Sequence, residues 1–214
     1  GMGLALYARP GTSAADLADG VVGVDVATSG FALALYALTE RLGLTRDQYT
    51  LTALGSTPRR LTALLAGECA ATMLNAGNEL IAEERGCACL GSVADHLSPY
   101  LGTVVAVAGE RRLDLARRLA SALVDTAAEI LAGGLTTEAA TSASRRLGLD
   151  DALAVRYVDR LRDPAAGLVP DGVVDAGSLE TLVSLRRTYL PAPTPDGADA
   201  LDAALAEDSG LVHA

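Results

Sequence analysis

The stretch that decides the fold of this chain reads Val21-Val22-Gly23-Val24-Asp25-Val26-Ala27-Thr28-Ser29-Gly30-Phe31. Its first six residues are mostly β-branched and apolar, which is typical of a strand covered on both faces. Thr28 and Ser29 then offer hydroxyl groups as helix caps, and Gly30 leaves the backbone open to a close approach. The stretch therefore predicts a buried strand that runs through a polar turn directly into a helix.

The end of this strand has two interpretations. Where a strand leads into a helix N-terminus, unpaired backbone N–H groups and the two hydroxyls stand at one place, which suits an anion or a polar ligand. In the other interpretation, Thr28 and Ser29 only cap their own helix, as such residues most often do. The local sequence leaves both interpretations open.

Length and composition restrict the class of protein. The 214 residues suffice for one large or two small domains, and a hydrophobic fraction of 50% allows a substantial core. The formal net charge of −10 argues against a nucleic-acid surface, because phosphate binding needs a basic footprint. No apolar run approaches the roughly 20 residues of a membrane span. We therefore expect neither an anchor nor an export signal in this chain.

Cysteine and histidine are too few and too scattered to predict a metal site. Cys69, Cys87 and Cys89 have no CxxC spacing, and the histidines are His96 and His213. We therefore expect no metal and no cofactor. The cysteines are interpreted as small buried strand residues, with a disulfide from Cys69 to Cys87 or Cys89 as the alternative.

Strands and helices alternate up to residue 108, which predicts a parallel sheet in an α/β fold. Two further polar turns, Gly55-Ser56-Thr57-Pro58 and Asn75-Ala76-Gly77-Asn78, stand between a strand and a helix, and Thr57 and Asn78 are the expected N-caps. The three polar turns should lie at the carboxyl ends of strands on one edge of the sheet, where open α/β sheets bind ligands. The predicted strands are 4–8, 21–26, 49–54, 69–74, 87–90 and 101–108, and the predicted helices are 14–17, 31–42, 58–66 and 79–85.

Two arginines and a helical tail complete the pattern. Arg59 and Arg60 oppose the dipole of the helix that they begin, a cost that a local anion could offset, although a solvated face is the expected explanation. After Gly109 the sequence predicts helices alone, and their apolar faces need something to pack on. These helices are expected at 111–131, 137–147, 150–161, 177–189 and 198–206.

Four segments carry a resemblance to a known family. They are Asp16-Leu17-Ala18-Asp19-Gly20-Val21-Val22-Gly23-Val24-Asp25 with Thr28-Ser29-Gly30-Phe31, Leu64-Leu65-Ala66-Gly67-Glu68-Cys69-Ala70-Ala71-Thr72-Met73-Leu74-Asn75, Leu90-Gly91-Ser92-Val93, and Pro99-Tyr100-Leu101-Gly102-Thr103-Val104-Val105. Together they resemble ABC-transporter substrate-binding proteins of the type II fold, the group that includes sulfonate, taurine, nitrate and thiamine-precursor binders. The resemblance covers about residues 4–130 closely and the helical tail loosely.

The resemblance implies a division into lobes. Residues 9–102 would form the second, ligand-binding lobe, while 1–8 and 103–214 would supply the hinge strands and the helical remainder of the first lobe. The first part of the first lobe has no counterpart in this sequence. We therefore expect a homo-oligomer, because the tail would otherwise leave apolar faces uncovered.

The resemblance also implies a ligand site. Thr28, Ser29 and Gly30 would meet the anionic or polar head of a ligand at the helix N-terminus. Where relatives often carry prolines after the Asn75 position, this chain has Ala76 and Gly77, so the kind of ligand does not transfer. The full set of expected ligand-binding residues is Thr28, Ser29, Gly30, Phe31, Ser56, Thr57, Asn75, Asn78 and Tyr100.

Three functions follow from these observations. The first is capture of a small organic solute, which could be an anion, for an ABC importer. The permease of the importer would be the partner, and the location would be extracytoplasmic. The second is an enzyme of cofactor biosynthesis on the same fold; against it, His96 lies beside Asp95 in what we interpret as a solvated loop pair. The third is a truncated interaction or regulatory module. We favour solute binding without catalysis and without a nucleic-acid partner.

Overall fold

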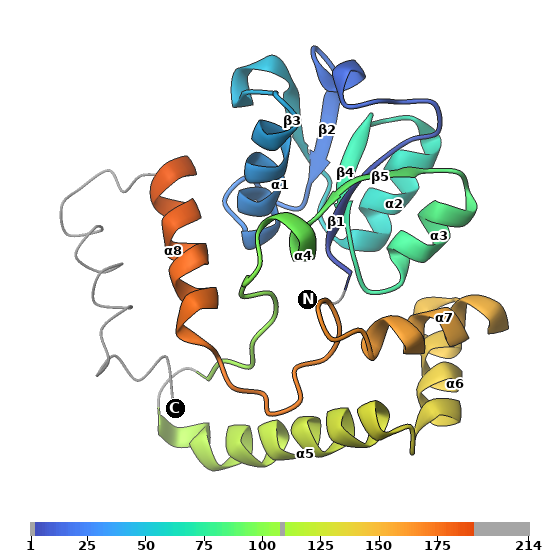
Figure 1. Cartoon of the computed structure of the whole chain (residues 1–214), viewed down its shortest axis with the longest axis vertical. Helices are drawn as coiled ribbons and strands as arrows, with labels where there is room; N and C mark the ends of the chain where they lie inside the picture. Colours follow the sequence, from blue (N-terminus) through green and yellow to red (C-terminus); the bar gives the residue numbers. More distant parts are fainter. Residues whose placement is uncertain (1–2, 108–109, 191–214) are drawn as a thin grey trace.

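A five-stranded sheet forms the centre of the computed structural model, which describes residues 3–107 and 110–190. The strands lie in the order β3-β2-β4-β1-β5 (Figure 1). Their bounds are β1 Ala5–Ala8, β2 Val21–Val24, β3 Thr50–Ala53, β4 Ala71–Leu74 and β5 Ala88–Ser92. Each predicted strand up to residue 90 is thereby confirmed, most of them shorter than expected.

Strand direction agrees with the predicted parallel sheet, with one exception. β2 runs parallel to β3 and β4, whereas β1 is antiparallel to both β4 and β5. Strands β2 to β5 therefore all end at one edge of the sheet. β1 begins at that edge, because Ala5 pairs with Leu74 on one side and with Ser92 on the other.

Helices cover both faces of the sheet, as the uninterrupted apolar strands require. Alternate residues of β1 show this: Leu6 packs with α1, and Tyr7 packs with α2 and α3 on the opposite face. α4 lies on the α1 side, directly after β5. These helices are α1 Gly30–Arg41, α2 Thr57–Ala66, α3 Asn78–Glu84 and α4 Val93–His96, joined by 3₁₀ turns at Ala15–Leu17 and Arg46–Gln48.

The tail is helical, as predicted, and only part of it packs on the sheet unit. α8 lies against α1, and α6 and α7 pack on α3 through a small apolar cluster that includes Leu80 and Leu153. α5 crosses beside them and buries only Ala127 among the described residues (Figure 1). The tail helices are α5 Leu113–Ala132, α6 Thr136–Leu147, α7 Asp151–Leu161 and α8 Ala176–Tyr189, with a 3₁₀ turn at Glu110–Arg112 before α5. The helix predicted at 198–206 lies outside the described residues.

Within the described residues, no single helix is long and apolar enough to cross a membrane. α5 and α6 meet the length and composition test only as a pair, and they are bent by 113° relative to each other.

The strand predicted at 101–108 is wrong for the residues that the structure describes. Residues 101–107 form no strand, and Val104, Val105 and Val107 are 48%, 50% and 39% exposed. A β-branched composition favours a strand only where a neighbour satisfies the backbone N–H and C=O groups. The described part of the chain provides no such neighbour, so the expected hinge strand is not formed there; residue 108 lies outside the description.

Four local predictions also need correction. Ser56, one residue before the predicted cap, is the N-cap of α2, and Gly77 precedes α3 with a φ of +88°, so that Asn78 is the first helical residue. His96 ends the one-turn helix α4 and is not in a loop. Cys69 and Cys87 are buried as predicted, but Cys89 is exposed, and all three are free thiols.

Candidate functional site

The first polar turn caps its helix and leaves two backbone donors at the edge of the sheet. The Ser29 hydroxyl accepts from the Ala32 N–H at 3.0 Å and donates to the Asp25 carboxylate at 2.5 Å. The first helical bond runs from the Leu33 N–H to the Ser29 carbonyl. The N–H groups of Gly30 and Phe31 therefore have no partner within the helix.

Thr28 and Tyr100 border this helix terminus. Thr28 is exposed, and no described residue bonds its hydroxyl. The Tyr100 hydroxyl donates to the Gly30 carbonyl, and a Cβ on Gly30 would stand 3.3 Å from that hydroxyl. Burial, followed by the nearby Asp25 charge, raises the pKa of Tyr100 to about 12. Gly30 is therefore the residue that allows Tyr100 to approach the helix.

The second and third polar turns contact each other. The Thr57 hydroxyl donates to the Asn75 side-chain oxygen at 3.1 Å, and the Asn78 amide donates to the Asn75 carbonyl at 3.0 Å. Ser56 is exposed at the N-cap of α2, and its side chain makes no capping bond. The predicted gathering of the polar turns on one edge is thus present in the geometry.

Arg60 joins the turns, and its role was not predicted. Its side chain is 1% exposed and donates to the Met73 carbonyl at 3.1 Å, to the Thr57 hydroxyl at 2.9 Å and to the Gly55 carbonyl. Its guanidinium also lies over the Phe31 ring, 5.3 Å from the centroid. Burial lowers the pKa of Arg60, and the Asp25 charge partly opposes that shift.

The sequence contained a signal for this burial. Arg60 lies four residues before Leu64, so both side chains share the face of α2 that packs on the sheet. The expectation of a solvated face holds for Arg59, which is exposed, and is wrong for Arg60. An arginine on the apolar face of a helix indicates a buried cation that satisfies backbone carbonyls.

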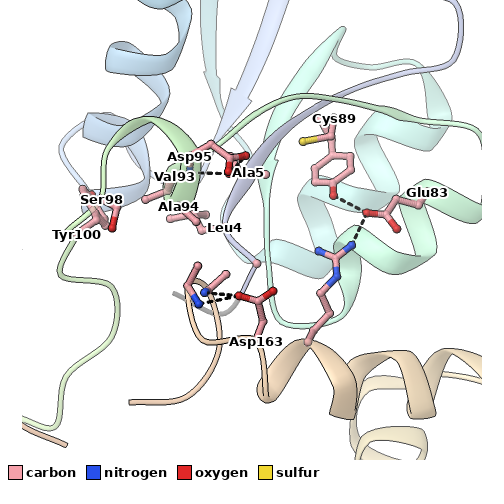
Figure 2. Close-up of a pocket in the computed structure, with 16 residues that line it drawn as sticks. Leu4, Ala5, Glu83, Cys89, Val93, Ala94, Asp95, Ser98, Tyr100 and Asp163 are labelled. Carbon is pink, nitrogen blue, oxygen red and sulfur yellow. Dashed lines mark hydrogen bonds and ion pairs between the residues drawn. The ribbon is translucent and has the colours of Figure 1, made fainter. Parts of the chain in front are cut away.

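A cavity of about 400 Å³ lies beside these turns, between the start of β1, the end of β5, α4 and the segment after α7. Among the residues predicted to bind ligand, only Tyr100 lines it. The cavity and the turns lie at the same edge of the sheet, because β1 begins where β4 and β5 end. Figure 2 shows the lining residues.

One wall of the cavity holds a network of charged side chains. Glu83 on α3 accepts from Tyr7 at 2.7 Å, from Arg160 at 2.8 Å and from Arg156 at 2.7 Å (Figure 2 shows the first two contacts). Although burial acts to raise the pKa of Glu83, the bonds from Tyr7 and Arg160 bring it below its usual value. Burial raises the pKa of Tyr7, so its hydroxyl stays protonated. The network connects α7 to the sheet unit.

Glu79 is a second carboxyl behind the same wall. It is 1% exposed, and its Oε2 has no hydrogen-bond partner among the described residues. Its Oε1 would lie 3.1 Å from a Cβ on Gly3, a residue that lines the cavity. Burial raises the pKa of Glu79 to about 7. In the described part of the chain, no group of three or more His, Cys, Asp or Glu side chains is placed to hold a metal ion.

Comparison with known proteins identifies the fold. No protein-family model and no curated protein matches the sequence. A ligand-binding component of an ABC-type import system from Staphylococcus aureus, solved with zinc bound, superposes with a TM-score of 0.70 at 15% identity, over 91% of this chain and 67% of that one. This chain has the substrate-binding-protein fold of ABC import systems.

Other solved structures agree. The periplasmic aliphatic sulphonate binding protein SsuA from Escherichia coli matches with a TM-score of 0.61 at 16% identity, over 90% of this chain and 66% of its own. The desulfurization enzyme DszB matches with a TM-score of 0.51 at 15% identity, over 93% and 73%. The chain thus spans about two thirds of the length of the two binding proteins. The fold is shared by binding proteins and at least one enzyme.

Proposed function

We propose that the protein captures a small organic solute, without catalysis, as the substrate-binding component of an ABC importer. The permease of that importer would be its partner, and its place of action would be extracytoplasmic. The ligand would bind at the carboxyl edge of the sheet, beside the first two polar turns. The fold and the convergence of these turns support the proposal.

Arg60 is the observation that carries this proposal, and it favours an anionic group on the ligand. The guanidinium is a buried cation at the meeting point of the turns, and no described carboxylate forms an ion pair with it. The N-termini of α1 and α2 add partial positive charge at the same edge. Asp25 offsets part of this charge. In a protein with a net charge of −10, such a positive edge suits an anion.

The proposal assigns roles to the predicted residues. The N–H groups of Gly30 and Phe31 and the hydroxyls of Thr28 and Ser56 would contact the anion. Thr57 and Asn75 would hold the second and third turns in register through their mutual hydrogen bond. Asn78, which starts a helix of only 7 residues, would position Asn75.

The proposed site belongs to a proposed lobe. We assign residues 9–102 to the ligand-binding lobe and the remaining residues to the hinge and the other lobe. β1 is shared, because it pairs inside the sheet of the ligand-binding lobe. Closure over the ligand would bring a second surface against the polar turns.

A thermal-shift screen of the full chain tests the function. Alkanesulfonates, nitrate, carboxylates and pyrimidines are the probes, and we expect at least one organic anion to raise the melting temperature in a saturable way. No stabilisation by any of them would contradict the proposal.

Two substitutions test whether the anion contacts the hydroxyls of Thr28 and Ser56. Thr28→Ala and Ser56→Ala remove exposed hydroxyls that support no described contact, so we expect weaker binding by about threefold to tenfold with unchanged stability. Ser121→Ala, at an exposed serine of α5, is the matched control and should bind as the unmodified protein does. Equal affinity in all three variants would show that neither hydroxyl contacts the ligand.

A further inference from the structure

One face of α5 carries an exposed seam of apolar and small side chains. Its members alternate at four-residue and three-residue spacing, which keeps them in one line along the helix. The nearest packing partner lies on the other side, because a Cβ on Gly172 would stand 2.7 Å from Val124, half a turn round the helix from Leu115. No described residue buries the seam, which consists of Leu115, Leu119, Ala122 and Thr126.

The seam needs no polar partner of its own. The Thr126 hydroxyl, its one polar side-chain group, donates to the Ala122 carbonyl of the same helix at 2.7 Å. Leu123 is exposed next to the seam and widens the apolar surface. A second apolar surface could therefore cover this face without leaving a donor or an acceptor unpaired.

A row of charged side chains runs along one side of the seam and changes sign halfway. Arg111, Arg118 and Asp125 follow one another at seven-residue spacing, close to two turns of the helix. Arg118 and Asp125 are exposed, and neither forms an ion pair with any described residue. The row thus begins basic and ends acidic.

This order of charges is unfavourable for α5 alone. Arg111 and Arg112 precede the first turn, and Glu129 lies in the last turn. The helix dipole favours the reverse, with acidic groups at the start and basic groups at the end. A second α5 that runs antiparallel would place the basic half of each helix beside the acidic half of the other. Charge complementarity therefore favours a second copy of this chain as the occupant of the seam.

We propose that two copies of the chain associate through α5, with the two helices antiparallel. Leu119 of one copy would lie opposite the partner's Ala122, and Leu115 opposite the partner's Thr126, so that each large side chain faces a smaller one. The seam is centred near the middle of the 20-residue helix, so the two helices overlap over most of their length.

The same alignment brings Arg118 beside the Asp125 of the other copy. Both residues flank the seam on the same side, and in an antiparallel pair the flanks of one side meet each other. Twofold symmetry forms this ion pair twice. The Arg118–Asp125 pair is therefore the contact that distinguishes antiparallel association from other arrangements.

This association is independent of the proposed solute site. None of the residues proposed to contact the ligand lies on α5. Failure of solute binding would therefore leave the result of the following experiments unaffected.

Sedimentation equilibrium of the full chain, from about 10 μM to about 1 mM, tests the association. We expect a monomer that converts to a dimer as the concentration rises. A monomer throughout this range would overturn the proposal, as would a species larger than a dimer that shows no dimer on dilution.

Reversal of the two charges tests the antiparallel arrangement. Arg118→Asp and Asp125→Arg each place like charges opposite each other twice, so each alone should weaken the dimer at least about tenfold. Asp125→Arg makes the chain less acidic, so a reduction of general repulsion between copies would give the opposite result. An equimolar mixture of the two variants restores both opposite-charge pairs in the mixed dimer. It should recover an affinity within about threefold of that of the unmodified chain.

Arg145→Asp is the matched control, because Arg145 is exposed on α6 and its replacement changes the net charge as Arg118→Asp does. Its dimer should match that of the unmodified chain within about twofold. Three outcomes would contradict the proposal: unchanged association of either α5 variant, an equal loss in the control, or a mixture that stays monomeric.

Discussion

The Arg60 guanidinium lies over the Phe31 ring, 5.3 Å from its centroid, and so connects the helix after the first polar turn to the helix after the second. The same group donates to the carbonyl of Met73 in β4 and to the carbonyl of Gly55, which follows β3. One buried side chain therefore sets the relative positions of the loops at the carboxyl edge. The candidate anion site depends on this residue more than on any of the predicted ones.

Removing the Arg60 side chain should loosen the whole edge. Arg60→Ala leaves two carbonyls and the Thr57 hydroxyl without their donor and opens a space beside Phe31, so we expect a loss of about 2–4 kcal/mol in the free energy of unfolding. Urea denaturation measures it. Arg59→Ala, at the exposed neighbour, should change stability by less than about 0.5 kcal/mol. Similar effects of the two substitutions would refute the structural role of Arg60.

Gly77 is the place where the tail helices meet the third polar turn. Its φ is +88°, and a Cβ there would lie 3.3 Å from Leu147 and from Leu149. Gly77→Ala should cost about 2 kcal/mol, part from backbone strain and part from displaced side chains. Gly11→Ala isolates the backbone part, because Gly11 has a φ of +74° and nothing within 4 Å of its Cβ position; we expect about 1 kcal/mol there. Equal losses would mean that α6 and α7 do not press on this turn.

Burial of Glu79 makes stability depend on pH. Burial raises the pKa of Glu79 from 4.5 to about 7 in the folded state. Between pH 4.5 and pH 7, Glu79 is therefore protonated in the folded chain and ionised in the unfolded chain. Stability should therefore fall as the pH rises through this window, by up to about 3 kcal/mol from this group. Glu79→Gln should remove that part of the fall. Urea denaturation of both proteins at pH 5 and pH 8 checks it, and an identical pH dependence in the variant would contradict the assignment.

The outer face of α5 is where we propose that copies of the chain associate. Leu115, Leu119 and Leu123 follow one another at four-residue spacing and are 57%, 50% and 49% exposed. Replacing all three with serine should shift the protein toward monomer, at about 1 kcal/mol of association free energy for each leucine. Light scattering over a concentration series measures the shift, with Val155→Ser, at a 54% exposed residue of α7, as the control. A monomer at all concentrations before substitution would refute association through α5.

Much of the fold was predictable because its signals are local. The apolar run after Gly20, the polar turns and the glycines at helix ends fix each strand-turn-helix unit without long-range information. Gly67, for example, ends α2 in the left-handed conformation, directly after the helix predicted at 58–66. The reversed direction of β1 was not predictable in this way, because a strand's direction depends on which neighbours it pairs with.

The gathering of the polar turns at one edge of the sheet was predicted, and the buried arginine that joins them was not. The hydroxyl and amide residues of the turns were recognisable by type, but Arg60 was assigned to solvent because most arginines are exposed. The cavity is formed by β1, α4 and the segment after α7, which are distant in sequence, so its lining residues share no local pattern. Residues 101–107 show the converse, since a strand-like sequence remained unpaired without a neighbour.

The central claim is that an organic anion binds at the N-terminus of α1, and amide NMR tests it most directly. The ¹⁵N-labelled full chain would be titrated with the anion that gives the largest thermal shift, and the amide signals of Gly30, Phe31 and Thr57 would be followed. The account predicts that these signals move together and saturate at the same ligand concentration. Saturable binding that leaves them unmoved, with changes confined to other parts of the chain, would contradict it.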